Sequence, residues 1–360
     1  MMKRAVTILI VLAAEFALFE AGLRLHAGTE AAPEFQALFA QDDRIGHVLK
    51  PGASARFSTV EFTTDIHING AGVRDDDFGS KPPDERRVVI LGDSLVLAVQ
   101  VPLSDTFAKH LERRLNTGRR DRLRYRVINA GVQGYGPVEE RLFFEKVASK
   151  LEPDLVIVGV YVGNDAIEAV DSAPKIHPDP ASVDEAGDRA AQGLRRLVRR
   201  SIVLQIARLR AQTLAARLGT PTPERPLLTY LADEPDVVRR GLEITAECLE
   251  QIRDEARRAG ATIAILLLPA RFQLDDEDYR LLSGIVEGAG GHLDRDAAST
   301  RFDAALQRVG VPILDPLAVF RRAVDPQSLY FETTAHLTPR GHEVLAGALY
   351  DFLVDRRLVP

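Results

Sequence analysis

The sequence predicts an α/β protein whose parallel sheet is covered by helices on both faces. From residue 85 onward, short continuous apolar runs alternate with longer amphipathic segments. Continuous apolar runs are typical of strands buried on both faces, and alternation with helices is typical of parallel sheets, whose strands need crossover connections. The chain has 360 residues, 46% of them hydrophobic, which is enough to bury a full core.

The first 27 residues predict a hydrophobic N-terminal helix. The basic start "MMKR" is followed by "AVTILIVLAAEFALFEAGLRL", of which only residues 5–14 form a run free of charge. That run is short for a membrane span, but the basic start favours a cytoplasmic N-terminus with the rest exported. We expect an uncleaved signal-anchor over 1–27 that tethers an extracytoplasmic, periplasmic protein to the inner membrane. A cleaved signal peptide and a buried helix of a cytoplasmic protein are the alternatives.

Residues 28–84 are rich in Gly, Pro, Asp and Thr and predict an extended lead-in packed on the main domain. Two strand-like pieces lie in it, "RFSTVEF" (56–62) and "DIHING" (65–70). The pair Asn69–Gly70 indicates a turn, although the segment 65–76 could also reach a functional site.

The main domain is expected over residues 85–360. The predicted strands span 86–91, 125–130, 154–162, 261–268 and 311–315. The predicted helices span 104–115, 136–151, 234–260 and 338–357. The first helix is expected to begin at a Ser104–Asp105 cap, the second has Pro137 in its first turn, and the third ends at Gly260.

An insertion interrupts this alternation at about 168–235. It holds a Pro/Asp-rich stretch and then an arginine-rich segment that carries no acidic residue between 190 and 223. We expect a helical insertion with a solvated basic face. A cap over the site and a contact with anionic lipid headgroups are the alternatives.

Composition excludes several classes of function. The formal net charge of −6 gives no support for a nucleic-acid partner. A single cysteine, Cys248, excludes an intramolecular disulfide and is expected to be a small core residue. The histidines are scattered, so the sequence predicts neither a metal site nor a cofactor.

Chemistry-bearing residues follow the predicted strands where those strands end. Ser94 follows the first strand in "LGDSL", Gly134 the second in "NAGVQGYG" and Asn164 the third in "VGNDA", while His336 lies in "TTAHLTPRGH". Ligands of parallel sheets bind beyond the carboxyl ends of the strands. A serine nucleophile needs a neighbouring base, and acyl transfer needs hydrogen-bond donors for the developing oxyanion. Each residue alone also fits a structural role: a helix cap, a loop glycine, a turn or a surface histidine.

Together these blocks resemble the GDSL or SGNH hydrolase family, from about Arg86 to Arg357. The resemblance implies Ser94 as the nucleophile, His336 as the base, and an oxyanion hole of Ser94, Gly134 and Asn164. It also implies a flavodoxin-like, three-layer α/β/α fold with a mainly parallel five-stranded sheet. The sequence lacks G-x-S-x-G, which argues against an ordinary α/β-hydrolase elbow.

One member of the expected triad is missing. The family carries an aspartate two or three residues before the histidine, and this chain has Thr334 and Thr333 there. The site could work as a Ser–His dyad in which a backbone carbonyl or Thr334 holds His336. Glu332 could supply the acid instead, or the site could have become a binding surface. We favour a working dyad because the other blocks are intact.

We expect four further residues, all near the candidate site residues or a strand end, to have structural roles. Asp93 and Asp165 are expected to bond nearby loop backbone. Arg271 is expected on a connecting loop, with a substrate carboxylate as the alternative partner. His342 lies beyond the spacing that would pair it with His336 on one helix face, so we expect a packing or helix-surface residue.

The predicted function is a serine esterase that hydrolyses acyl or acetyl esters through a Ser–His acyl-enzyme. Its expected partners are an acylated small-molecule, glycan or lipid substrate of the cell envelope and, through the N-terminal helix, the membrane. One alternative is an O-acyltransferase that acts on a polysaccharide. The other is a non-catalytic envelope or carbohydrate-binding protein.

Overall fold

The computed structural model describes residues 35–118, 122–176 and 225–359. The predicted N-terminal helix and the arginine-rich part of the insertion lie outside these residues. Within the described part of the chain, no helix is both long and apolar enough to cross a membrane.

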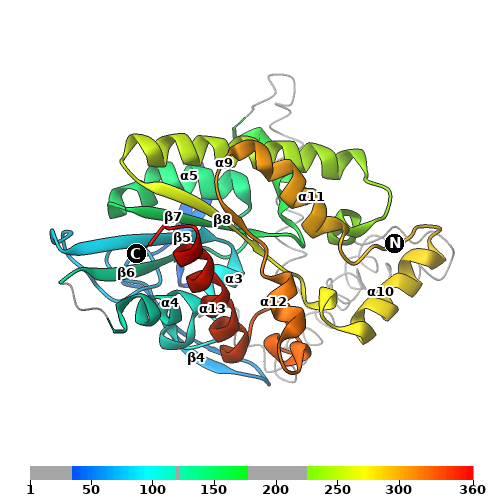
Figure 1. Cartoon of the computed structure of the whole chain (residues 1–360), viewed down its shortest axis with the longest axis horizontal. Helices are drawn as coiled ribbons and strands as arrows, with labels where there is room; N and C mark the ends of the chain where they lie inside the picture. The colour runs from blue at the N-terminus through cyan, green and yellow to red at the C-terminus, as the bar shows by residue number, and fades with distance from the viewer. Residues whose placement is uncertain (1–34, 119–121, 177–224, 360) are drawn as a thin grey trace, which may run out of the picture. The chain divides into compact units, whose positions relative to one another are not determined.

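A five-stranded parallel sheet forms the centre of the described fold (Figure 1). Its strands are β5 (Glu85–Gly92), β6 (Arg124–Gly131), β7 (Leu155–Tyr161), β8 (Thr262–Leu268) and β9 (Ile313–Leu314). Their order is β6-β5-β7-β8-β9, and every neighbouring pair is parallel. Numbered along the chain this is 2-1-3-4-5, the flavodoxin-like order, which confirms the predicted sheet.

Helices cover both faces of the sheet. They are α3 (Ser94–Leu97), α4 (Phe107–Asn116), α5 (Pro137–Lys146), α6 (Asp165–Ser172), α9 (Asp236–Arg258), α10 (Asp276–Gly288), α11 (Ala297–Leu306), α12 (Leu317–Arg322) and α13 (Pro339–Asp355). Alternate strand residues point to opposite faces. Val89 and Leu91 join the core beneath α5 and α9, whereas Val88 and Ile90 join the core beneath α4 and α13 (Figure 1).

The predicted Ser104–Asp105 cap of the helix α4 is wrong, and several helices were not predicted. Helix α4 is capped by Thr106, whose hydroxyl accepts the N–H of Lys109 at 3.4 Å, while Ser104 lies in a preceding 3₁₀ turn, η1 (Leu103–Asp105). Thr106 has extended backbone angles and the turn ends before it, so the helix can begin only at the next residue. Helices α6, α10, α11 and α12 were not predicted.

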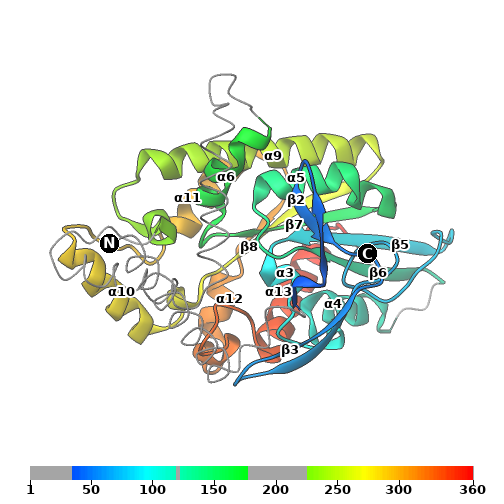
Figure 2. The ribbon, with the colours of Figure 1, turned by 180° about the vertical axis from the view of Figure 1, so that it is seen from behind.

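The lead-in contains two antiparallel hairpins (Figure 2). They pair β1 (Phe39–Asp42) with β2 (Gly46–Leu49) and β3 (Ser54–Ser58) with β4 (Thr63–His67). Leu49 and Ile66 are buried in the same core as Val89 of β5. After β4 the chain turns at Asn69, whose side-chain oxygen accepts the N–H groups of Ala71 and Val73.

Candidate active site

Ser94 is presented by a tight turn from strand to helix. Gly92 ends β5 with φ +155°, and a Cβ there would lie 2.2 Å from Val96 Cγ2, so only glycine fits. The Asp93 side chain accepts the N–H of Leu95 at 2.8 Å and caps α3, as predicted for a bond to local backbone. Ser94 is therefore the first residue of α3 and lies half-buried at the carboxyl edge of the sheet.

The lead-in supplies a residue that holds the other end of α3. Arg74 is 1% exposed, and its guanidinium donates to the carbonyls of Leu97 (2.8 Å), Ala98 and Val101 (2.6 Å). Burial lowers the pKa of Arg74 to about 10, so the group remains a cation at neutral pH. A cation beside the last carbonyls of a helix stabilises that helix end. Arg74 belongs to the segment 65–76, so this stretch contacts the C-terminal end of the helix that begins with Ser94.

His336 lies beside Ser94, with Nε2 2.9 Å from Ser94 Oγ. The structure thus brings together the predicted nucleophile and base, which are 242 positions apart in the sequence. In this geometry Nε2 of a neutral imidazole accepts a hydrogen bond from the Ser94 hydroxyl, and the ring carries its own proton on Nδ1. Burial lowers the pKa of the His336 imidazole to about 4, so the ring is neutral over most of the pH range.

Within the part of the chain that the structure describes, no group holds the far side of the imidazole. Nδ1 of His336 is buried and has no hydrogen-bond partner among these residues, and the buried hydroxyl of Thr334 has none either. Glu332 is exposed, and its backbone N–H donates to Glu61. The structure therefore does not bring the side chain of Glu332 or of Thr334 into hydrogen-bond contact with the ring, and this arrangement matches the Ser–His dyad that we favoured over a third acid.

The sheet order places the two other predicted donors on either side of Ser94. Strands β6 and β7 flank β5, so the loops that carry Gly134 and Asn164 rise from the neighbouring strands at the same edge. Gly134 is exposed with φ +69°. The Asn164 amide donates one hydrogen to Glu168 Oε1 at 2.8 Å, which leaves its second hydrogen for another acceptor.

Three buried carboxyl groups and one half-buried carboxyl group lie behind this edge, and sequence reasoning missed them as a cluster. Asp93, Glu140 and Asp165 are each at most 4% exposed, and Glu168 is half-buried. Burial raises the pKa of Asp93 to about 7 and that of Glu168 to about 8. Burial, reinforced by the neighbouring carboxylates, also raises the pKa values of Glu140 and Asp165 well above their ordinary range. Each of these carboxyl groups therefore keeps its proton to a higher pH than an exposed carboxyl group does.

Asp165 bonds nearby backbone as predicted, since its carboxyl accepts the N–H of Tyr161 at 2.8 Å.

The described residues contain no group of three His, Cys, Asp or Glu side chains that could hold a metal ion.

The remaining singled-out residues have structural partners. Arg271 forms ion pairs with Asp278 (3.0 Å) and Asp275 (3.5 Å) and donates to backbone carbonyls, so its guanidinium is engaged by the protein itself. His342 is 1% exposed, stacks on Phe107 and accepts its N–H at 3.3 Å, which makes it a packing residue.

Cys248 is fully buried in α9, and burial raises the pKa of its thiol to about 12, as expected for a core residue.

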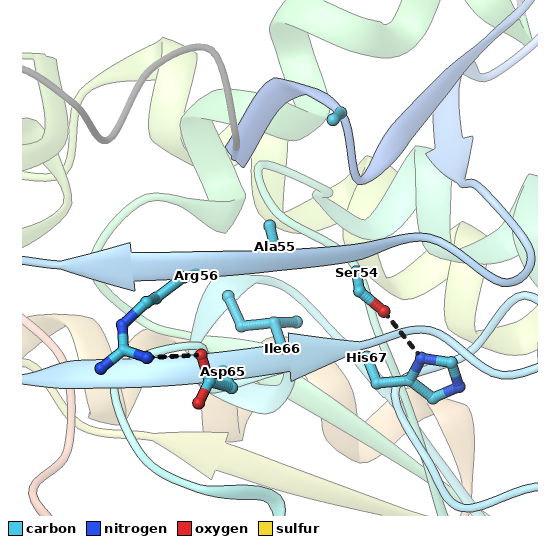
Figure 3. A pocket seen from close by; sticks show the side chains of 7 residues that line it. Ser54, Ala55, Arg56, Asp65, Ile66 and His67 are labelled. Carbon is cyan, nitrogen blue, oxygen red and sulfur yellow. Dashed lines mark hydrogen bonds and ion pairs between the residues drawn. The ribbon is translucent and has the colours of Figure 1, made fainter.

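A second Ser–His contact lies in a hollow of the lead-in (Figure 3). Ser54 Oγ is 3.0 Å from His67 Nδ1, because the two residues are cross-strand partners in the β3–β4 hairpin. Both side chains are exposed, and the hollow contains neither Ser94 nor His336. This pair belongs to a separate two-stranded sheet and is exposed, whereas Ser94 and His336 are half-buried and Ser94 follows a strand of the parallel sheet.

No family model and no curated protein matches the sequence. Solved structures with similarity to the chain include the acetylxylan esterase Axe2 from Geobacillus stearothermophilus, at 13% identity and a TM-score of 0.41, over 74% of this chain and 94% of that one. The lipase/acylhydrolase from Enterococcus faecalis is 12% identical with a TM-score of 0.40, over 75% of this chain and 96% of the other. TesA is 14% identical with a TM-score of 0.40, over 74% and 98%. The function of this chain is therefore inferred from the residues of its own site.

Proposed function

We propose that this protein is a serine esterase of the SGNH type that works with a Ser–His dyad. The observation that carries the proposal is the 2.9 Å contact between Ser94 Oγ and His336 Nε2 at the carboxyl edge of a parallel sheet. A serine at hydrogen-bond distance from a buried, neutral imidazole is the arrangement that activates a hydroxyl for attack on an acyl group.

The reaction follows from these positions. Ser94 Oγ attacks the ester carbonyl while His336 Nε2 takes the hydroxyl proton. The N–H groups of Ser94 and Gly134 and the free amide hydrogen of Asn164 would stabilise the oxyanion. His336 then returns the proton to the leaving alcohol, and an acyl-Ser94 ester remains. Water, deprotonated by His336, attacks that ester, and the acid leaves as Ser94 regains its proton.

We further propose acyl or acetyl esters of an envelope glycan or lipid as substrates. Support comes from the basic and then apolar first 27 residues, which indicate an exported protein tethered to the inner membrane. If a glycan hydroxyl replaced water in the second step, the same site would act as an O-acyltransferase. Product analysis with a glycan acceptor separates the two, because transfer yields an acylated glycan and hydrolysis yields free acid.

The full-length protein is expected to hydrolyse p-nitrophenyl acetate and to be labelled by a fluorophosphonate at Ser94. The reason is that both reactions need an activated serine with an accessible oxygen. Ser94→Ala should abolish labelling and reduce hydrolysis to the uncatalysed rate. Ser54→Ala, which alters the exposed Ser–His contact of the hairpin, should leave both unchanged. A folded wild type that shows neither hydrolysis nor labelling would contradict the esterase proposal and favour a binding protein.

The acid limb of the pH–rate profile is expected near pH 4. Burial lowers the pKa of His336 to about 4, so the base is protonated, and inactivated, only when the pH falls toward that value. The measurement is kcat/KM for a short ester between pH 3.5 and 7 by pH-stat, because this parameter reports the free enzyme. Circular dichroism at each pH controls for unfolding. A midpoint at or above 6.5, the ordinary histidine value, would show that the imidazole is not desolvated.

A further inference from the structure

The loop that carries His336 is closed at its base. Tyr330 and Leu337 pair in an antiparallel bridge, and the N–H of Phe331 donates to the carbonyl of His336 at 2.9 Å. The two ends of the loop 331–336 are therefore hydrogen-bonded to each other. His336 lies at one end, and residues 331–333 form the opposite arm of the loop. Because the arm is bonded to the backbone of His336, we expect a shift of the arm to displace the imidazole.

Glu61 holds the N–H side of this arm from the lead-in. It lies between β3 and β4, and its carboxylate accepts the N–H of Glu332 at 2.7 Å and the N–H of Thr333 at 3.1 Å. The hydroxyl of Thr333 also donates to it. Burial alone would raise the pKa of the Glu61 carboxyl, but these hydrogen bonds outweigh it and hold that pKa below its usual value. Glu61 is thus ionised at neutral pH, and its hydrogen bonds are charge-assisted and strong.

Arg271 holds the carbonyl side of the same arm. Its guanidinium donates to the carbonyl of Phe331 at 3.4 Å and to that of Glu332. The ion pairs of Arg271 with the acids of α10 and its cap fix the guanidinium in turn. The ring of Phe62, next to Glu61, packs against Phe331 with centroids 5.2 Å apart. The two peptide groups between residues 331 and 333 therefore donate their N–H groups to the Glu61 carboxylate and accept hydrogen bonds from the Arg271 guanidinium at their carbonyls.

These hydrogen bonds to the loop matter because few other contacts among the described residues orient the His336 imidazole. In a serine–histidine–acid triad the acid bonds Nδ1 and fixes the orientation of the ring. Here Nδ1 of His336 has no hydrogen-bond partner among the described residues, and the contact with Ser94 Oγ is made by the other ring nitrogen, Nε2. The angle of the ring toward Ser94 consequently depends on the backbone of the loop.

We propose that Glu61 is a positioning residue for His336, with Arg271 as its counterpart. The inference rests on the proposed esterase function and adds that the β3–β4 hairpin is a working part of the active site. Glu61 does not contact the reacting atoms. It acts by fixing the loop from which the base projects.

The test compares variants of the full-length protein on a short p-nitrophenyl ester. Glu61→Gln keeps the size but removes the negative charge and replaces one of the two accepting oxygens with an NH2 group, so one of the two N–H donors loses its acceptor, and kcat should fall about 10- to 100-fold with KM nearly unchanged. Thr333→Val removes one donor and should lower kcat, whereas Thr333→Ser keeps the hydroxyl and should retain near wild-type kcat. Asp65→Asn is the matched control, because Asp65 lies on the same hairpin and faces Arg56 (Figure 3).

Hydrogen exchange gives a readout that is independent of activity. In Glu61→Gln the amides of residues 331–336 should exchange faster than in the wild type, while those of β5 should not change. Unchanged exchange together with unchanged kcat would overturn the inference, as would an effect on KM alone or an equal loss in Asp65→Asn. If the wild type is inactive but amide exchange in residues 331–336 is still faster in Glu61→Gln, the esterase proposal fails. The inference that Glu61 fixes this loop would then remain.

Discussion

Replacing His336 with glutamine is expected to lower kcat for ester hydrolysis by about 10³-fold or more. Glutamine can still hydrogen-bond Ser94 Oγ, but it cannot take the proton, so the hydroxyl remains a weak nucleophile. Because no acid or second base contacts this pair among the described residues, nothing else can assume the role. Steady-state kinetics on a short ester measures the loss, and thermal melting verifies that the variant is folded.

The hairpin provides a matched control for this experiment. His67 also lies within hydrogen-bond distance of a serine, Ser54, but both side chains are exposed and belong to the separate β3–β4 hairpin rather than to the parallel sheet. His67→Gln should leave kcat and KM unchanged. A loss in His67→Gln as large as that in His336→Gln, or no loss in His336→Gln, would be incompatible with His336 as the base.

The second large effect is a fall in the free energy of unfolding as pH rises from 6.5 to 9. The buried carboxyl groups Asp93, Glu140, Asp165 and Glu168 have raised pKa values in the fold, whereas they ionise near pH 4 in the unfolded chain. The folded state therefore binds more protons than the unfolded state in this window, and stability must fall with pH. The stabilisation is full below the unfolded pKa and is lost as pH rises through about 7 and 8.

Between pH 6.5 and 9 the buried histidines do not change the free energy of unfolding in the opposite direction. His336 and His342 have pKa values lowered to about 4 and about 3, so they favour the fold as pH rises toward 6.5 and add nothing beyond it. Each titrating carboxyl adds a slope of at most about 1.4 kcal/mol per pH unit.

Urea melts at several pH values between 6.5 and 9, on the wild type and on Glu140→Gln, measure the slope, which should be shallower in the variant. Glu145→Gln is the control on the same helix α5, because Glu145 is an ion-paired carboxylate with a lowered pKa. A wild-type stability that is flat or rises between pH 6.5 and 9 would show that the cluster is not protonated in the fold.

Most of the sheet could be predicted from the sequence because its strands are buried on both faces. Runs such as 88–91 within the first predicted strand and 263–268 within the fourth are continuous and apolar, so composition alone distinguishes them from their surroundings. The same reasoning placed Ser94 and Asn164 at strand ends. Ser94 and His336 could be paired only through the resemblance of their motifs, since nothing in the local pattern relates residues so far apart.

The supporting residues could not be predicted, for two physical reasons. Glu61 and Arg74 act through single hydrogen-bonded contacts with distant backbone, and such contacts leave no periodic signal. Glu140 belongs to "VEERLFFEK", where its charge and its place in a helix indicate a solvated face. Its burial is a property of the tertiary packing of α5 and α6.

The contact between Glu61 and the histidine loop bears on when the protein becomes competent during synthesis. Glu61 and Glu332 are 271 positions apart, so their hydrogen bond closes one of the longest loops in the chain. Contacts of this separation form late, since the chain loses the entropy of loop closure before it gains their energy. A nascent chain therefore carries Ser94 and the hairpin without a base for most of its elongation. On the proposed function, ester hydrolysis cannot begin before residues 331–336 have been synthesised and have folded against the hairpin and Ser94.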